Sequence, residues 1–382
     1  MKKEKIGICT LYTGYNFGSA LQAYSTKMIL DEMGFEPELF KVSGSLVRGR
    51  DIRLKKTLIL FTRMLLFSKN KINVIKSFSG NNKSNVNIKT LNEFDDFYNN
   101  KLNPTVISYK KLKKISKNTE YISFICGSDQ IWNSTAFYVD PFYYLSFCPK
   151  NKRIAYAPSF GRTYIPTYNK NIIKKKLLGI DNISVRENSG KKIIKELINK
   201  DVDVCLDPTL LLDKHKWKKS LEVSKINKKY ILCYFLNTPS LNAKKFINKL
   251  SIEKKMDVIS INNNFFKNVV YGGPETFLSF LSSAEYVITD SFHGVAFSIN
   301  FEKKFYVFDR QYITENQSTR IKSLLEIVNL EDVFECEYEL DSNYFDYKMV
   351  SNILSKEREK SLEFLKKSIR SCENNEKRKR LN

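Results

Sequence analysis

The amino-acid sequence predicts an α/β protein made of two doubly wound domains that face each other across a cleft. Short apolar, strand-like runs alternate with helix-like runs along most of the chain, which is typical of parallel sheets covered by helices. This alternation restarts after residues 202–212, and 382 residues are too many for one ordinary core. We predict an N-terminal domain over residues 1–206, a C-terminal domain over 207–345, and a C-terminal helix with a basic tail over 346–382.

The first domain begins with a strand–loop–helix–strand order. Residues 6–11 predict a buried strand, and the glycine-punctuated residues 13–19 predict a loop. A helix over 20–33 then ends at Gly34, and residues 35–42 predict the next strand. The loop matches neither the Gly-x-Gly-x-x-Gly dinucleotide pattern nor the phosphate-loop pattern with its lysine, so it does not indicate a nucleotide site.

A basic segment follows over residues 48–78. It is rich in Lys and Arg, contains a single acidic residue, Asp51, and carries apolar residues throughout. This pattern predicts a basic helical insertion in the N-terminal domain. Such a helix either lies on an anionic membrane surface or packs on its own domain with a solvated basic face, and both interpretations stay open.

Two further strand ends in the first domain carry polar groups. The apolar run 121–126 leads into Gly-Ser-Asp-Gln-Ile-Trp-Asn over 127–133, where Trp132 indicates either a sugar-contacting loop or a turn with a core tryptophan. Further along, Arg186 stands where a strand meets a helix. Its guanidinium could grip a carboxylate or phosphate, or could form a structural pair with Glu187 or Asp181.

The second domain repeats the alternation and contains the most informative run of the chain. Residues 286–294, Tyr-Val-Ile-Thr-Asp-Ser-Phe-His-Gly, form a short strand, a polar loop and the start of a helix. His293, one of two histidines in the chain, lies at this turn. Ligands of doubly wound sheets collect at such strand ends, and helix N-termini favour anions. His293 could therefore hold a phosphate or move a proton, although it could also merely cap the helix. The remaining predicted elements are strands over 230–236, 257–261 and 305–308, and helices over 242–254, 275–283 and 348–369.

Composition narrows the classes of partner and compartment. The net charge of +23 favours anionic partners, but the lysines are scattered and no zinc-finger or aromatic–basic RNA motif occurs, so we expect no nucleic acid. The seven cysteines contain no Cys-x-x-Cys pair, which indicates neither a metal nor a redox site and suits a reducing cytosol. No run reaches the ~18 apolar residues of a membrane span. We expect a cytoplasmic protein, with peripheral binding to the inner face of the membrane if residues 48–78 bind lipid.

Five motifs in this order resemble the polysaccharide pyruvyl transferase family, nearly end to end. They are Asn16-Phe17-Gly18, Gly127 to Asn133, Ser184 to Glu187, Leu206 to Thr209, and Asp290 to Gly294. The resemblance implies two Rossmann-like domains arranged as in GT-B glycosyltransferases, with the acceptor on the N-terminal domain and the donor on the C-terminal one. It also implies transfer of pyruvate from phosphoenolpyruvate to two hydroxyls of a cell-surface glycan sugar, as a ketal, with no metal and no cofactor besides that donor substrate.

The resemblance also implies roles for particular residues. His293 would be a phosphate ligand or proton donor, Arg186 an anion clamp, and Asp129 a group that orients or deprotonates an acceptor hydroxyl. Residues expected at the donor are Arg186, Gly272, Gly273, Ser291, Phe292, His293 and Gly294. Residues expected at the acceptor, a glycan or lipid-linked oligosaccharide, are Asn16, Gly18, Ser128, Asp129, Gln130 and Trp132.

The chain departs from the family pattern at Ser291. Many relatives carry an arginine there, two residues before the histidine, and a serine cannot supply that charge. Arg162, Arg310 or Arg320 could replace it.

Two other functions remain open. One is a GT-B glycosyltransferase whose nucleotide-activated donor would be cradled by Gly272-Gly273-Pro274 and residues 290–294. The other is a non-catalytic glycan- or membrane-binding protein that has lost its donor site.

Overall fold

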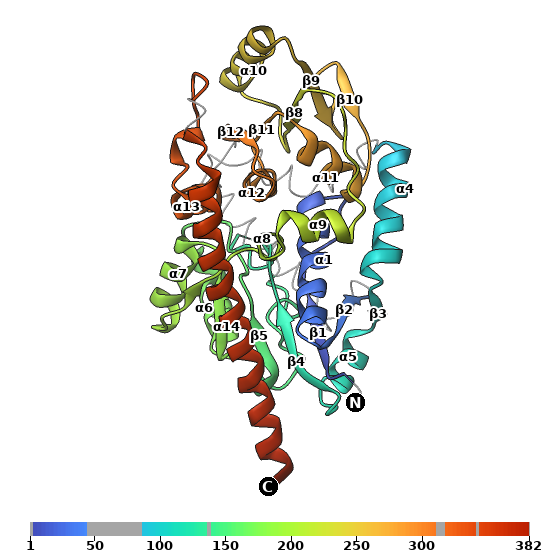
Figure 1. Cartoon of the computed structure of the whole chain (residues 1–382). Helices are drawn as coiled ribbons and strands as arrows, with labels where there is room; N and C mark the ends of the chain where they lie inside the picture. The colour runs from blue at the N-terminus through green and yellow to red at the C-terminus, as the bar shows by residue number, and fades with distance from the viewer. Residues whose placement is uncertain (1–2, 44–85, 136–138, 311–317, 341–343, 382) are drawn as a thin grey trace, which may run out of the picture.

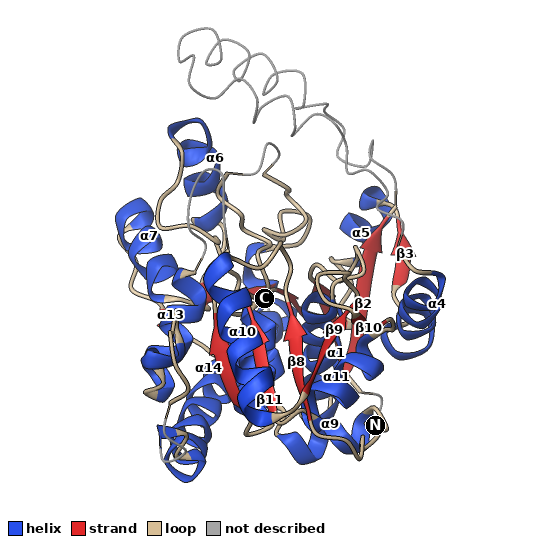
Figure 2. Cartoon of the chain, turned by 90° about the horizontal axis from the view of Figure 1, so that it is seen from above, coloured by secondary structure: helices blue, strands red, loops and turns tan. Residues whose placement is uncertain are grey.

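The computed structural model describes residues 3–43, 86–135, 139–310, 318–340 and 344–381. The basic segment over 48–78 lies outside the described residues, so neither interpretation of it is tested. Figure 2 shows the strands in the interior of the molecule and helices on both sides of them.

The first sheet has seven parallel strands in the order β3-β2-β1-β4-β5-β6-β7. Every residue of β4 is buried, and this explains its continuous apolar run, because helices cover both faces of a parallel sheet. The strands are β1 (Lys5–Cys9), β2 (Glu36–Val42), β3 (Thr105–Ile107), β4 (Tyr121–Cys126), β5 (Arg153–Ala155), β6 (Asn182–Val185) and β7 (Asp203–Val204). The helical segments between them are α1 (Phe17–Glu32), α4 (Ile88–Asp96), η3 (Phe97–Leu102), α5 (Tyr109–Ile115), η4 (Lys150–Lys152), α6 (Thr167–Leu177) and α7 (Asn188–Ile198).

The second sheet has five parallel strands in the order β10-β9-β8-β11-β12. Both sheets therefore start in the middle, grow to one side and then switch to the other, which is the doubly wound topology predicted from the sequence. The strands are β8 (Tyr230–Tyr234), β9 (Asp257–Ile261), β10 (Asn268–Val270), β11 (Tyr286–Thr289) and β12 (Lys304–Val307). The helical segments are α8 (Pro208–Leu211), α9 (Lys214–Ser220), α10 (Leu241–Lys254), α11 (Pro274–Ser283), α12 (Phe292–Asn300), α13 (Thr319–Val328) and η5 (Glu331–Val333).

The last helix, α14 (Tyr347–Leu381), connects the two halves of the molecule. Figure 1 shows it running from beside α13 down along the first sheet. The Arg358 side chain donates to the Leu210 carbonyl (2.6 Å) and the Asn300 side chain (3.1 Å). Ser361 accepts a hydrogen bond from the backbone N–H of Leu206 (3.0 Å). These bonds tie α14 to α12 and to the chain around α8.

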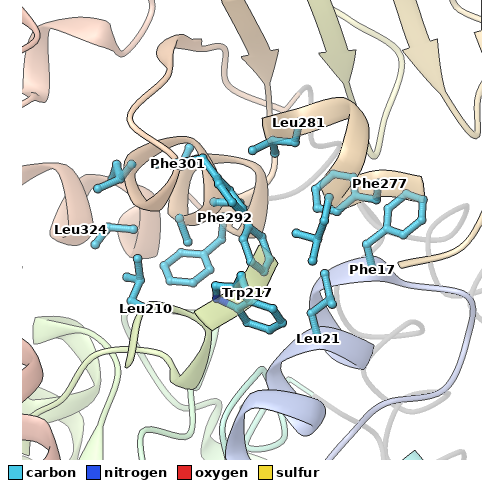
Figure 3. Packing of buried hydrophobic residues seen from close by; sticks show 14 of the residues in the cluster. Phe17, Leu21, Leu210, Trp217, Phe277, Leu281, Phe292, Phe301 and Leu324 are labelled. Atoms are coloured by element: carbon cyan, nitrogen blue, oxygen red, sulfur yellow. The ribbon is translucent and has the colours of Figure 1, made fainter. Parts of the chain in front are cut away.

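An aromatic stack joins the two sheets on the other side. Phe17, the first residue of α1, stacks on Phe277 of α11 with ring centroids 4.6 Å apart, and on Phe94 of α4 at 5.3 Å. Figure 3 shows Phe17 and Phe277 in this packing, with Trp217 and Phe292 nearby. One hydrophobic cluster thus runs from the first sheet to the second, and it fixes the N-terminus of α1 against the C-terminal half.

We predict that Phe17→Ala destabilises the protein by about 3–5 kcal/mol, because it removes a buried ring that contacts two other rings. Chemical denaturation of the full chain measures this change. Ile252→Ala, at a 77% exposed position on α10, is the control and should change the free energy of unfolding by less than about 0.5 kcal/mol. Equal effects of the two substitutions would contradict the role of the stack.

Candidate active site at the junction of the two sheets

The switch points of the two sheets meet. In the first sheet, the switch point lies between β1 and β4, which lead into the N-terminus of α1 and the loop at Gly127–Gln130. In the second sheet it lies between β8 and β11, and β11 leads into the N-terminus of α12. Doubly wound proteins bind their ligands at such crevices. The carboxylate of Asp290 holds the second crevice together by accepting from the backbone N–H groups of Leu236 (2.7 Å) and Asn237 (3.1 Å).

Gly18 of α1 lies directly against His293 of α12 at this junction. A Cβ atom at Gly18 would lie 1.9 Å from Nδ1 of His293, so only glycine lets the imidazole pack against α1. The neighbouring residue, Ser19, donates a 2.5 Å hydrogen bond to the Asp129 carboxylate. Asp129 has a φ of 64°, a left-handed conformation that Asp adopts more readily than most residues. Gly18 and the carboxylate of Asp129, both from the N-terminal half, therefore lie near His293 of the C-terminal half.

Arg186 lies at the centre of the junction. Its side chain is 1% exposed, and its Nη1 bonds Asp207 Oδ2 at 2.6 Å while Nη2 lies 3.8 Å from Asp129 Oδ1. The guanidinium also lies over the Phe292 ring, 4.3 Å from its centroid. Burial lowers the pKa of Arg186, but Asp207 and Asp129 outweigh that effect and raise it above its usual value. Arg186 is thus a charged group held at one position.

Asp207 lies beside both Arg186 and His293. Its Oδ2 accepts from Ser128 Oγ (2.9 Å) and Arg186, and lies 3.7 Å from Nε2 of His293, an ion-pair distance too long for a hydrogen bond. Its Oδ1 caps α8 by accepting from Thr209 N at 3.0 Å. Burial raises the pKa of Asp207, but the charges of His293 and Arg186 bring it well below its ordinary range. Asp207 therefore stays ionised between them.

Sequence reasoning did not find the role of Asp207. Residues 202–212 indicated only a crossing between domains, and the competing structural partners considered for Arg186 were Glu187 and Asp181. The structure pairs Asp181 with Lys150 instead (2.9 Å). Glu187 accepts from Ser159 Oγ (2.8 Å) and the backbone N–H of Phe160 (3.1 Å), and complete burial raises its pKa despite the opposing charge of Arg186. The available signal was the Leu-Asp-Pro-Thr motif itself, since Asp before Pro-Thr is a helix cap.

Several nitrogens at this junction are buried and have no hydrogen-bond partner among the residues that the structure describes. They are Nε and Nη2 of Arg186, Nε of Arg320 and Nε2 of His293. Folded proteins rarely leave buried donors unpaired, and such groups mark places where a ligand or water completes the bonding. Their gathering around one ring, Phe292, indicates a binding site for a group that accepts hydrogen bonds.

The other predicted site residues fall into two groups. Those at the junction have structural contacts. Asn16 caps α1 by accepting from Ser19 N (3.0 Å), and Ser291 caps α12 by accepting from Gly294 N (3.4 Å). Ser128 is fully buried, and the Gln130 N–H bonds the Asp129 carboxylate (2.8 Å). The residue that caps α12 is therefore Ser291 and not His293, whose ring packs against Gly18.

Trp132 and the glycine pair of α11 lie away from this cluster. Trp132 is 1% exposed, stacks on Tyr144 at 5.1 Å and donates to the Tyr143 carbonyl, so it is a core tryptophan and does not face a sugar here. Gly272 and Gly273 precede α11, where the Glu93 carboxylate accepts from Gly273 N (2.6 Å) and from Thr276 Oγ1 (2.6 Å). The anion position at that helix N-terminus is already filled by Glu93.

No helix in the described part of the chain is both long enough and apolar enough to cross a membrane. Within the same residues, no group of three or more His, Cys, Asp or Glu side chains has the arrangement of a metal site.

The molecule is an α/β protein of two Rossmann-like domains that meet through their switch points. An arginine and a histidine are buried where they meet. The chain belongs to the polysaccharide pyruvyl transferase family, whose model matches residues 16–312. No curated protein matches the chain.

Solved structures that resemble the chain at low sequence identity include MnaA, a UDP-GlcNAc 2-epimerase and a glycosyltransferase. MnaA of S. aureus, in a structure with UDP, is 11% identical, with 92% of this chain and 95% of that one covered and a TM-score of 0.43. UDP-GlcNAc 2-epimerase from Neisseria meningitidis, bound to UDP-GlcNAc, is 10% identical, with 93% and 100% covered and a TM-score of 0.42. The glycosyltransferase SnogD from Streptomyces nogalater is 9% identical, with 96% and 100% covered and a TM-score of 0.45.

We predict that Gly18→Ala destabilises the protein by about 1–3 kcal/mol, because the new methyl group overlaps the His293 ring. In a His293→Ala background the same substitution should cost less than about 0.5 kcal/mol, since the overlap is gone. A double-mutant cycle by chemical denaturation measures both values. An equal cost in the two backgrounds would show that the glycine is needed for another reason.

We predict that Asp207→Asn destabilises the protein by about 3–5 kcal/mol at pH 7, because it leaves Arg186 buried without its main partner while preserving the α8 cap. The pKa of Asp207 is lowered in the folded protein, so its contribution is complete above the unfolded value of about 3.9 and is lost as the pH falls below it. The difference between wild type and variant should therefore shrink below about pH 4.

Denaturant titrations between pH 7 and pH 3 test this dependence. Asp257→Asn is the matched control, since that side chain is 52% exposed and pairs only with Lys228 among the described residues. The control should cost less than about 1 kcal/mol at every pH. A constant difference between wild type and Asp207→Asn across this range would contradict the assignment.

Proposed function

We propose that this protein transfers the pyruvyl group of phosphoenolpyruvate to two hydroxyls of a sugar in a cell-surface glycan, forming a cyclic ketal. The observation that carries the proposal is the set of buried, unpaired donors on Arg186 and His293 where the two switch points meet. Membership of the polysaccharide pyruvyl transferase family supports it. The donor is a substrate, and the reaction uses no further cofactor.

The chemistry of the donor suits this position. Phosphoenolpyruvate carries a phosphate ester and a carboxylate on the same carbon, so it needs cations that are fixed before it binds. Arg186 meets this need because Asp207 and the Phe292 ring hold its guanidinium, leaving Nε and Nη2 without a hydrogen-bond partner. His293 lies beside it and acts as a ligand of the phosphate or as the proton donor.

The reaction needs one proton donor and two attacking hydroxyls. A proton goes to the methylene carbon of phosphoenolpyruvate, and the central carbon becomes electrophilic. One sugar hydroxyl attacks that carbon and gives up its proton, and the C–O bond to phosphate breaks. The second hydroxyl then attacks the same carbon and closes the ketal. The proton of the first hydroxyl restores the proton donor and that of the second leaves with the phosphate, so the products are the pyruvylated sugar and inorganic phosphate. The carboxylate of Asp207, 3.7 Å from His293 Nε2, would stabilise the imidazole at the steps in which it is protonated.

The acceptor sugar would approach from the first domain, beside Asp129. Burial raises the pKa of Asp129, but His293 and Arg186 lower it more, so the side chain stays an ionised carboxylate. Such a weak base orients a sugar hydroxyl by accepting its hydrogen bond rather than keeping its proton. Asn16, Gly18, Ser128 and Gln130 shape the backbone around this carboxylate.

The geometry does not favour the nucleotide-sugar alternative at Gly272 and Gly273. The carboxylate of Glu93 already occupies the N-terminus of α11, and a diphosphate there would face a negative charge.

We predict that phosphoenolpyruvate raises the melting temperature of the protein and that UDP-GlcNAc does not, because Arg186 and His293 suit the phosphate and carboxylate of a compact anion. His293→Ala should weaken phosphoenolpyruvate binding at least about tenfold in calorimetry, the effect of losing a charge-assisted hydrogen bond. It should also abolish transfer to any acceptor that the wild type uses.

The matched control is His215→Ala, which changes the other histidine at an exposed position of α9. It should bind phosphoenolpyruvate as the wild type does. Stabilisation by UDP-GlcNAc alone would support a glycosyltransferase, and stabilisation by neither ligand would support a non-catalytic binding protein.

A further inference from the structure

A second buried arginine, Arg320, lies against the same aromatic ring as Arg186. Arg320 is near the start of α13, in the C-terminal half, and is 7% exposed. Its guanidinium carbon is 6.0 Å from the centroid of Phe292, and that of Arg186 is 4.3 Å from the same centroid. Two guanidinium groups from opposite halves of the molecule therefore gather around one ring.

The two arginines differ in how their charge is balanced. Arg186 has carboxylates of Asp207 and Asp129 within ion-pair distance, whereas Arg320 has none among the described residues. Burial and then the charge of Arg186 lower the pKa of Arg320 to about 10. Its Nε has no hydrogen-bond partner. Glu187 and Asp129 oppose this shift in part, but neither carboxylate lies within ion-pair distance of Arg320. A buried charge beside a like charge is costly, and an anion bound between the two arginines would offset that cost.

Arg310 shows what a structural arginine looks like at the same junction. Its Nε donates to the carbonyl of Asp290 (3.0 Å) and lies 3.3 Å from the Oδ2 atom of that residue. Arg310 therefore fastens the loop before α12. Among the residues that the structure describes, none forms a bond of this kind with Arg320, so the contact made by Arg310 has no counterpart there.

We propose that Arg320 and Arg186 form a two-arginine clamp for one oxyanion of the donor, with Arg320 supplying the charge that Ser291 lacks. The proposal rests on the proposed function in that phosphoenolpyruvate is the expected ligand. The Phe292 ring supports both cations from the side. Because the two arginines come from different halves, anion binding ties α13 to the first sheet.

The test compares Arg320→Gln with wild type by calorimetry. The variant should bind phosphoenolpyruvate about 10- to 100-fold more weakly, as expected for losing charge-assisted hydrogen bonds. Without ligand, its melting temperature should be equal to or higher than that of the wild type, because an unbalanced buried charge is removed. A purely structural arginine would give the opposite, a lower melting temperature with unchanged affinity. Arg370→Gln, at an exposed position of α14, is the control and should change neither.

Further titrations distinguish two outcomes: that the two arginines do not form a clamp, and that phosphoenolpyruvate is not the donor. Titrations with inorganic phosphate and with pyruvate show which end of the donor the clamp holds. Binding of phosphate but not phosphoenolpyruvate by the wild type would reject the donor and keep the clamp, provided that Arg320→Gln weakens the phosphate. Affinity within twofold of wild type in Arg320→Gln, or no anion binding by the wild type, would overturn the clamp. Should Arg320→Gln not fold, Arg320→Lys serves instead: an intermediate affinity supports the clamp and wild-type affinity rejects it.

Discussion

The buried ion pair between Arg186 and Asp207 is the interaction on which the rest of the junction depends. At 2.6 Å and with both side chains almost completely buried, the pair joins the end of β6 to the start of α8, where the chain leaves the first sheet. Neither partner could stay there alone, because an unpaired charge in this environment would be strongly destabilising. The same carboxylate caps α8, accepts from Ser128 and lies beside His293, so one side chain sets the position of four neighbours.

The close approach of α1 and α12 follows from the same arrangement. Both helices start at a switch point, and the absence of a side chain at Gly18 lets the imidazole of His293 pack against the other half. The Phe17–Phe277 stack and the hydrogen bonds of α14 hold the halves at this distance from two sides. Groups that act on one small ligand must be placed within about half an ångström, and rigid elements achieve this better than loops do. The packing of the two halves is thus part of the site.

Several buried polar groups at the junction lower the stability of the fold. Two guanidinium groups lie near one ring, a buried glutamate sits beside them with one oxygen unpaired, and the imidazole Nε2 has no hydrogen-bond partner. A core selected only for folding would avoid such groups or satisfy them fully. Their presence in this chain, a member of the polysaccharide pyruvyl transferase family, supports the proposal that an anionic substrate completes their bonding.

The sequence alone determined the two parallel sheets and most of their strands. The spacing of apolar residues and the positions of glycine and proline between elements are local properties of the chain. It also placed Arg186, Asp129 and His293 at strand ends, where doubly wound folds bind ligands. It could not assign Trp132 to the core, find Glu93 at the start of α11, or distinguish the surroundings of Arg310 from those of Arg320. Those outcomes depend on contacts between residues tens to hundreds of positions apart, such as Gly18 with His293 or Arg186 with Asp207. Only the tertiary structure decides them, since burial and charge pairing arise when distant segments pack together.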